Sequence, residues 1–431
     1  MRSFIYLGIL AGILLLPQDS AAQEKAVRRS LRVAVYPYIP GKAGMYWRME
    51  REFEAEHPLI DLQYIDTAYN YYGGDIAEVL QEKKADIAEV DTVLLEDLAD
   101  DGLLAQIPAS CIEKDAFFPH AVKASQVDGK TFGVPHWVCG NFLFFRKDDP
   151  EAKRFREIDS LDDLERILGQ PLSQQDSLMV DLRGSSTLGE KYLDAMLDKF
   201  KTVEKVLEEL RKEKDSEPVL DPEVIRNLDR LFALCPGGLC DSEKHHEFGE
   251  FYARQFAERE CRCLIGYSER MYFVLDHNLH GIREGKPSVG RFGFPPSNDY
   301  KPTGIDDIDV VPAALSNQGQ KMLSWVDVLA IRSGLEDQTQ KDAEAFIKFF
   351  NSEEFFTKVL VPEYGKAPRY LLPARKSVYK DADLLGAAPL YRRFHEIMLN
   401  STSISDDDLN ARLRKIGKRI EKRGFRPVLA P

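Results

Sequence analysis

The side chains of this chain that could do covalent chemistry most directly are six cysteines: Cys111, Cys139, Cys235, Cys240, Cys261 and Cys263. A deprotonated thiol is a strong nucleophile, and two thiols can also form a disulfide. The segment Cys235-Pro-Gly-Gly-Leu-Cys240 predicts a loop closed by a local bridge. Cys261 and Cys263 would face the same side of a strand, too far apart for an easy bridge. If Cys139 is a free thiol, the even count leaves one of the other five free as well.

The spacing of histidines and cysteines does not indicate a metal site. No second pair of cysteines has metal-ligand spacing, and the histidines are scattered. His277 and His280 are three residues apart and could share a helix face, but two histidines do not complete a metal site. We therefore expect neither a metal nor an organic cofactor.

One carboxylate, Asp91, stands where α/β proteins place ligand groups. It follows a predicted strand at residues 85–90, and the carboxyl ends of such strands commonly carry ligand contacts. Predicted strands and helices alternate in this part of the chain, with strands at 31–38 and 60–65 and helices at 45–56, 75–84 and 94–98. Strands that alternate with helices indicate βαβ units and a largely parallel sheet.

The rest of the chain is also predicted to fold as α/β structure. Residues 149–259 are helix-rich and highly charged, which is typical of solvated helix faces. Further elements are predicted as strands at 261–267 and 324–331, a long loop at 285–309, an amphipathic helix at 343–360 and a packed helix with a basic outer face at 409–426.

Composition and charge exclude two classes of protein. The chain has 431 residues, of which 44% are hydrophobic, so it can bury a sizeable core and is not mainly disordered. Its formal net charge of -13 argues against a nucleic-acid partner, because nucleic acids need a basic surface. An acidic protein of this kind is suited to attract a cation.

The first residues have the pattern of an export signal. Arg2 is followed by an apolar stretch at residues 4–16 and by Ser20-Ala21-Ala22, so cleavage after Ala22 is predicted. An uncleaved anchor is the alternative, but the apolar stretch is short for a membrane span. We expect residues 1–22 to be a signal peptide, and the mature chain to be a periplasmic or secreted monomer with no membrane insertion.

Several segments resemble the extracellular solute-binding proteins, the two-lobed periplasmic receptors. They include Phe53-Glu54-Ala55-Glu56-His57-Pro58, Asp128-Gly129-Lys130-Thr131-Phe132-Gly133-Val134-Pro135 and Leu372-Pro373-Ala374-Arg375. The resemblance implies a two-lobed α/β fold, each lobe a mainly parallel sheet flanked by helices, with the ligand cleft between the lobes. We expect residues 31–140 with about 300–345 to form the first lobe, and about 141–299 with about 346–426 the second.

A narrower resemblance is to the thiaminase I family, the thiamine pyridinylases, which are built on this fold. Val134-Pro135-His136-Trp137-Val138-Cys139 resembles the active-site segment of that family, and Gly266-Tyr267-Ser268-Glu269 resembles its Gly-Tyr-x-Glu strand end. The resemblance implies Cys139 as the nucleophile and Glu269 as the general base. The substrates would be thiamine and an amine or thiol acceptor, which replaces the thiazole of thiamine.

The same resemblance suggests which residues bind the substrate. Ala85-Asp86-Ile87-Ala88-Glu89-Val90-Asp91 and Ser324-Trp325-Val326-Asp327 resemble ligand-binding segments of the family, although Trp325 stands where the family has Tyr. Carboxylates suit the protonated aminopyrimidine and the thiazolium cation, and aromatic faces suit the rings. The expected substrate-binding residues are Asp91, Tyr267, Asp327, Tyr38, Tyr36, Tyr252 and Trp325.

Two other functions fit the same fold. One is a binding protein that delivers thiamine or another organic cation to a membrane transporter, which would need neither a nucleophile nor a base. The other is a related enzyme that acts on a different heteroaromatic substrate, an alternative that the changed Trp325 segment leaves open.

Overall fold

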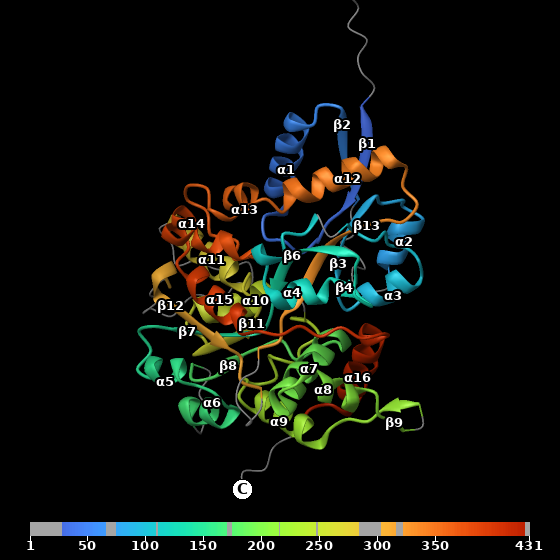
Figure 1. Cartoon of the computed structure of the whole chain (residues 1–431). Helices are drawn as coiled ribbons and strands as arrows, with labels where there is room; N and C mark the ends of the chain where they lie inside the picture. The colour runs from blue at the N-terminus through green and yellow to red at the C-terminus, as the bar shows by residue number, and fades with distance from the viewer. Residues whose placement is uncertain are drawn as a thin grey trace, which may run out of the picture.

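The structure is a computed structural model that describes residues 28–65, 75–108, 111–169, 175–214, 216–246, 249–283, 303–315 and 322–426. The expected signal peptide at residues 1–22 lies outside these ranges. Two separate sheets, one above the other in Figure 1, each form the centre of a lobe. Within the described ranges, no helix has the length and apolar character needed to cross a membrane.

The first lobe is built on a six-stranded sheet in the order β14-β6-β13-β3-β1-β2. Its strands are β1 (Arg29–Ala34), β2 (Ile60–Tyr64), β3 (Ile87–Asp91), β6 (Gly133–Cys139), β13 (Trp325–Ile331) and β14 (Leu372–Pro373). Every residue of β3 and β13 is buried, as expected for central strands covered on both faces. Strand β1 is parallel to β2 and β3, whereas β13 is antiparallel to β3 and β6.

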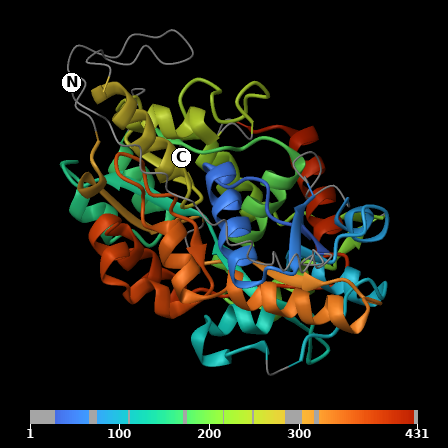
Figure 2. The same ribbon diagram turned by 90° about the horizontal axis from the view of Figure 1, so that it is seen from above.

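Helices from distant parts of the sequence cover this sheet together. Helix α1 (Lys42–Glu56) and helix α12 (Asp337–Phe350) contact each other, with the rings of Phe53 and Phe346 5.3 Å apart. Seen from above, α1 in blue and α12 in orange lie over the same lobe (Figure 2). The other helices of this lobe are α2 (Asp75–Gln81), α3 (Leu95–Asp100), α4 (Pro119–Ala124) and α13 (Glu353–Leu360).

The second lobe has a four-stranded sheet in the order β12-β7-β11-β8. Its strands are β7 (Phe142–Arg146), β8 (Leu178–Met179), β11 (Cys263–Gly266) and β12 (Ile308–Pro312). Around them lie α5 (Ala152–Arg156), α6 (Leu161–Leu168), α7 (Ser185–Phe200), α8 (Val203–Leu210), α9 (Pro222–Ala233), α10 (Gly249–Ala257), α11 (Arg270–Arg283), α14 (Ala382–Ala387), α15 (Leu390–Leu399) and α16 (Leu409–Arg423). Two short hairpins, β4 (Gln126–Val127) with β5 (Lys130–Thr131) and β9 (Glu213–Lys214) with β10 (Glu217–Pro218), lie outside both sheets.

The two-lobed α/β fold is confirmed, but the sheets are mixed rather than mainly parallel. In the second lobe, β11 is parallel to β8 and antiparallel to β7, and β12 is antiparallel to β7. The chain crosses from the first lobe to the second between β6 and β7, and it returns to the first lobe between β12 and β13. Strand β12 is antiparallel to β7, and β13 is antiparallel to β3 and β6. Alternating strands and helices predicted only the parallel part, because β13 and β14 enter the first sheet late in the sequence.

The boundaries of the lobes also differ from the expected ranges. Residues 300–345 were expected in the first lobe, but β12 pairs with β7 in the second sheet. Residues 346–426 were expected in the second lobe, but β14 pairs with β6 in the first sheet. Strand pairing assigns these segments, and the sequence of a single short strand does not indicate its partner.

Two local predictions also need correction. The helix predicted at 343–360 is two helices, because Ser352 accepts a hydrogen bond from the Phe355 N–H and so begins α13 as a new helix. The first strand ends at Ala34, so Tyr36 and Tyr38 lie in the connection to α1 rather than on the strand.

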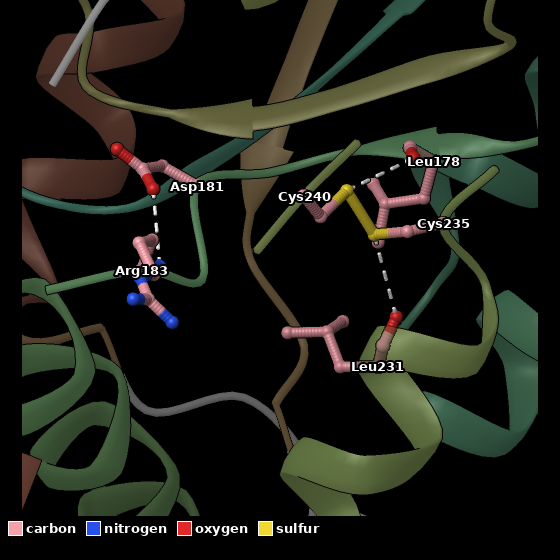
Figure 3. Close-up of a disulfide and its surroundings, with 6 residues drawn as sticks. All are labelled: Leu178, Asp181, Arg183, Leu231, Cys235 and Cys240. Carbon is pink, nitrogen blue, oxygen red and sulfur yellow. Dashed lines mark hydrogen bonds between the residues drawn. A yellow bond between two sulfur atoms is a disulfide. The ribbon is translucent and has the colours of Figure 1, made fainter. Parts of the chain in front are cut away.

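The local disulfide is confirmed. Cys235 and Cys240 are bridged, and Cys111, Cys139, Cys261 and Cys263 are not in disulfides. The bridge joins the segment after α9 to the segment beside β8, close to Leu178 (Figure 3). The Leu182 N–H donates to the Cys240 carbonyl, so this bridge supports the chain next to Asp181.

The basic C-terminal segment is a packed helix, as predicted. Helix α16 buries Leu409, Leu413, Ile416 and Ile420 and packs along α7. The two helices approach closely at glycines. A side-chain carbon at Gly417 would lie 1.7 Å from the Ser185 carbonyl oxygen.

We predict that Gly417→Ala destabilises the folded protein by about 1–3 kcal/mol or more, because the added methyl forces α16 away from α7. Urea unfolding of the mature chain measures this change. Gly386→Ala is the matched control, since Gly386 is on helix α14 with open space around it. That control should be neutral or stabilising by about 0.5–1 kcal/mol. Equal effects of the two substitutions would contradict the close helix contact.

Candidate active site

A cavity of about 800 Å³ lies between the two lobes. Its wall comes from the connection between β1 and α1, the first turns of α7, the start of α10, the step from β11 into α11 and the segment that follows α13. Five of the residues expected at the site line it: Tyr36, Tyr38, Tyr252, Tyr267 and Glu269. Both lobes therefore contribute to one cleft, which is where proteins of this architecture hold small molecules.

Cys139 lies beside this cavity at the end of β6. It is half-buried and pairs across the sheet with Trp325 of β13. Asn141, two residues further on, is in the cavity wall. Burial raises the pKa of the Cys139 thiol well above its usual range, and the charges of Asp327, Glu269, Asp91 and Glu190 raise it further. The thiol is thus protonated at neutral pH unless something offsets these negative charges.

Asp91 and Asp327 are direct neighbours across the pairing of β3 with β13. Both are buried, so two carboxylates share a region with little solvent. Burial raises the pKa of Asp91 well above its usual range, and the Asp327 charge adds to this rise. The Val93 N–H donates a hydrogen bond to Asp91 Oδ1 at 3.0 Å, which lowers the pKa of Asp91 and so opposes this rise. Two like charges this close favour a proton or a cation between them.

Glu269 lies in the turn between β11 and α11, and its side chain is in the cavity wall. Burial raises the pKa of Glu269, while the positive charge of Arg270 and the main-chain N–H of Glu269 itself lower it. A carboxylate with a raised pKa is suited to take a proton and return it near neutral pH. Because its charge acts on the Cys139 thiol, the nucleophile and base expected from the sequence lie at one site.

Tyr267 is held by a residue that the sequence did not indicate. Strand β11 ends at Gly266, so Tyr267 lies in the turn, and its hydroxyl donates to Glu190 Oε2. Burial raises the pKa of Tyr267 well above its usual range, and the Glu190 charge adds to it. Glu190 belongs to α7, in a region whose many charges predicted solvated helix faces, but α7 is largely buried. The charge pattern of the sequence therefore does not single out Glu190.

Close to Tyr267, the buried cation Lys191 belongs to a series of polar side chains linked by hydrogen bonds. Lys191 is only 4% exposed, and its Nζ donates to Asn141 Oδ1. Asn141 Nδ2 in turn donates to Asp194, whose pKa burial raises to about 7. The Lys191 Nζ also lies 5.6 Å from the centre of the Tyr267 ring. These hydrogen bonds orient Asn141, two residues after Cys139, where the chain crosses between the lobes.

The aromatic residues expected at the site take different positions. Tyr36 and Tyr38 line the cavity with their rings 5.4 Å apart, and Tyr252 of α10 lines it from the second lobe. Trp325 is buried beside Cys139 in the sheet and is not in the cavity wall. Cys139, Asp91 and Asp327 also lie next to the wall rather than in it.

The comparisons agree with this architecture. A model of the bacterial extracellular solute-binding protein family matches residues 49–389, and the chain therefore belongs to that family. It is also similar to a particular enzyme: thiaminase-1 of Paenibacillus thiaminolyticus is 26% identical over 419 residues, which cover 92% of this chain and 90% of that protein. The resemblance to thiaminase I is thus confirmed.

Solved structures of thiaminase I share the fold. The enzyme from Bacillus thiaminolyticus superposes with a TM-score of 0.72 at 22% identity, covering 92% of this chain and 99% of that one. The Clostridium botulinum enzyme in complex with thiamin also gives 0.72, at 24% identity, covering 91% and 99%. A maltose-bound receptor, T. maritima MalE3, gives 0.63 at 15% identity over 91% of this chain and all of that one.

We predict that Asp327→Asn makes the Cys139 thiol more acidic, because Asp327 is the carboxylate that raises its pKa most. The rate of alkylation by iodoacetamide at pH 8 should rise several-fold, measured in a Cys111→Ser background so that one accessible thiol remains. Glu250→Gln is the control, since Glu250 lines the cavity but is not among the carboxylates that act on Cys139. An unchanged alkylation rate in Asp327→Asn would contradict this electrostatic coupling.

Glu89 is buried in the first lobe and accepts a hydrogen bond from the main chain at Tyr36, so its protonation should affect folding stability. The Tyr36 N–H donates to Glu89 Oε2 at 2.7 Å, and burial raises the pKa of Glu89 to about 8. The neighbouring His136 stays neutral in this range, since burial lowers its pKa to about 3. The folded state therefore holds a proton that the unfolded state releases near pH 4.5.

Folding stability should consequently fall as the pH rises from about 4.5 to about 8. We predict that Glu89→Gln, which keeps an acceptor for the Tyr36 N–H but does not titrate, flattens the melting temperature between pH 5 and pH 8. Glu56→Gln, an exposed position on α1, is the control and should leave the profile as in the wild type. A Glu89→Gln profile parallel to the wild type would show that Glu89 is ionised in the folded protein.

Proposed function

We propose that this protein catalyses the thiaminase I reaction, in which an amine or thiol replaces the thiazole of thiamine. The observation that carries the proposal is the free Cys139 thiol beside a cavity between lobes, with the Glu269 carboxylate in the wall and acting on that thiol. The similarity to thiaminase-1 of Paenibacillus thiaminolyticus, and to a thiaminase I solved with thiamin, supports thiamine as the substrate.

The charges around Cys139 suit a cationic substrate. Burial raises the pKa of this thiol, and the charges of Asp327, Glu269, Asp91 and Glu190 raise it further. Thiamine carries a positive thiazolium ring, and its aminopyrimidine can also accept a proton. A cation bound beside these carboxylates offsets their field, which favours the thiolate. The nucleophile would thus be activated by the substrate that it attacks.

The reaction proceeds in two halves. Glu269 takes the proton of Cys139, and the thiolate adds to the pyrimidine ring. The bond between the methylene and the thiazolium nitrogen then breaks, and the thiazole leaves with the electron pair, which cancels its positive charge. The pyrimidine-methyl group stays bound to Cys139. Glu269 next releases the Cys139 proton to solvent. It then takes a proton from the acceptor, which attacks the methylene and displaces the Cys139 thiolate. The thiolate finally regains a proton from Glu269.

The remaining residues orient the substrate. Asp91 and Asp327 would hold the protonated aminopyrimidine, and Tyr36, Tyr38 and Tyr252 would pack against the rings. Glu190 would fix the Tyr267 hydroxyl, as their hydrogen bond indicates. In this arrangement Trp325 supports Cys139 through the sheet, since it is buried opposite it and outside the cavity wall.

The second candidate function is a receptor that binds thiamine or another organic cation for a transporter. The family match and the likeness to a maltose-bound receptor favour it, because both belong to the same fold. A receptor needs no nucleophile, so a free thiol beside a raised-pKa carboxylate is unexplained by it. An enzyme acting on another heteroaromatic substrate would use the same residues, and the choice of substrate in the assay separates these possibilities.

We propose that the protein acts as a monomer outside the cytoplasm, after cleavage of residues 1–22. Membership of an extracellular solute-binding family supports export. No metal or organic cofactor is needed for the steps above, which require only the protein and its two substrates.

The activity is tested by incubating the mature protein with thiamine and an amine such as aniline, and by following free thiazole. We predict that Cys139→Ser lowers the rate by roughly 10³-fold or more, because the nucleophile is lost. Glu269→Gln should lower it by about 10²–10⁴-fold, because the thiol and the acceptor then lose their proton acceptor. Cys111→Ser is the matched control and should retain activity.

The pattern across these variants separates the candidates. Thiazole release by the wild type that is lost in Cys139→Ser supports the enzyme and its nucleophile. Tight thiamine binding without any thiazole release, equal in the wild type and in Cys139→Ser, would favour the receptor. Neither binding nor release of thiazole would direct the search to another heteroaromatic substrate.

A further inference from the structure

The wall of the cavity also holds an arginine that the reaction above does not use. Arg369 lies between α13 and β14. Its Nε donates to the Pro40 carbonyl at 3.0 Å and its Nη1 to the Val359 carbonyl at 2.6 Å. These two main-chain acceptors fix the guanidinium in place but supply no negative charge.

No carboxylate forms an ion pair with Arg369 in the part of the chain that the structure describes. The acidic residue nearest to it in sequence, Glu363, pairs instead with Arg48 at 3.5 Å and Lys366 at 4.0 Å. Burial lowers the pKa of Arg369, while the charges of Tyr272 and Glu363 act in the opposite direction. A positioned cation in a cavity wall, with no carboxylate of the described chain in an ion pair with it, is suited to bind an anion.

The space in front of Arg369 is kept open by two glycines. A side-chain carbon at Gly41 would lie 3.6 Å from Arg369 Nη2 and 3.9 Å from the Tyr272 hydroxyl, and one at Gly44 would lie 3.9 Å from Nη2. Among the described residues, Nη2 has no hydrogen-bond acceptor. Lys42, also in the cavity wall, adds a second positive charge, and the first turn of α1 contains no acidic residue.

The cavity wall therefore carries charges of both signs. The carboxylates of Glu190 and Glu269 act on Cys139, whereas Arg369 is fixed against the connection between β1 and α1, next to Lys42. Glu250 and Glu363 also belong to the wall, and Arg270 packs over Gly249 and Gly266 and acts on Glu269.

We propose that Arg369, Lys42, Tyr272 and the main chain at Gly41 and Gly44 form an anion subsite that binds a phosphate ester on the hydroxyethyl arm of the thiazolium ring. This inference rests on the proposed function. Thiamine monophosphate carries a ring cation and a phosphate on the same molecule, which matches a wall that holds both the carboxylates acting on Cys139 and Arg369. The guanidinium would donate charge-assisted hydrogen bonds from Nη2 to the phosphate oxygens.

The test compares kcat/KM for thiamine monophosphate and thiamine, with aniline as the acceptor. The wild type should prefer the monophosphate by about tenfold, as expected for one charge-assisted contact. Arg369→Gln should bring that ratio close to one. Arg51→Gln is the matched control: Arg51 lies over the Trp47 ring on α1, outside the cavity, and the ratio should stay as in the wild type.

Several outcomes would overturn the subsite. A wild type without preference for the monophosphate, or an Arg369→Gln variant that keeps the preference, contradicts it. A carboxylate on the acceptor is the other source of an anion, so 3-aminobenzoate is compared with aniline. If Arg369→Gln selectively impairs 3-aminobenzoate and leaves the monophosphate preference intact, the arginine serves the acceptor and the proposal fails.

Two further measurements keep the test independent of folding and of catalysis. If Arg369→Gln does not fold, Lys42→Gln should reduce the preference about twofold or more, and the wild-type preference should fall as salt rises from 50 to 500 mM. Equilibrium binding to Cys139→Ser should be about tenfold tighter for the monophosphate than for thiamine. This binding difference tests the subsite even if the wild type cleaves neither compound, whereas cleavage tests the proposed function.

Discussion

The antiparallel pairing of β13 between β3 and β6 is the constraint on which the rest of the site depends. It sets Asp327 directly beside Asp91 and Trp325 directly beside Cys139. Two carboxylates and a thiol are thereby held in a buried region at one end of the sheet. Burial disfavours the charged forms of Asp91 and Cys139, so both stay protonated more than usual. A cation bound beside this region would offset the negative charges and favour the Cys139 thiolate.

The second lobe completes the site through elements that are far from Cys139 in the sequence. The turn after β11 brings Glu269 and Tyr267, and α7 brings Glu190 and Lys191. The Lys191–Asn141–Asp194 chain joins α7 to the crossover between the lobes. Since the two lobes share the cavity wall, a change in their separation would alter the distance between the Cys139 thiol and the Glu269 carboxylate. A receptor could have the same two-lobed cavity, whereas the Cys139 thiol is a group that could also react with a bound molecule.

A solute-binding fold gives an enzyme a ready site for a small charged molecule. The site carries charges of both signs, with carboxylates and Arg369 in the cavity wall and Asp91 next to Asp327 in the first sheet. The main chain fixes two of these charges: the Val93 N–H holds Asp91, and the Pro40 and Val359 carbonyls hold Arg369. Fixed charges of this kind select substrates by where their own charges lie, rather than by size alone.

The sequence by itself determined the early strands and helices, the local Cys235–Cys240 bridge and, through its motifs, the resemblance that singled out Cys139 and Glu269. These features depend on residues close together in the chain. Only the tertiary structure decided that β12 joins the second sheet and β14 the first. It also decided that Glu190 meets Tyr267, and that Arg369 has no carboxylate partner in the described chain. The physical reason is that a local pattern reports how an element is buried, whereas its neighbours are chosen by pairing and packing between distant segments.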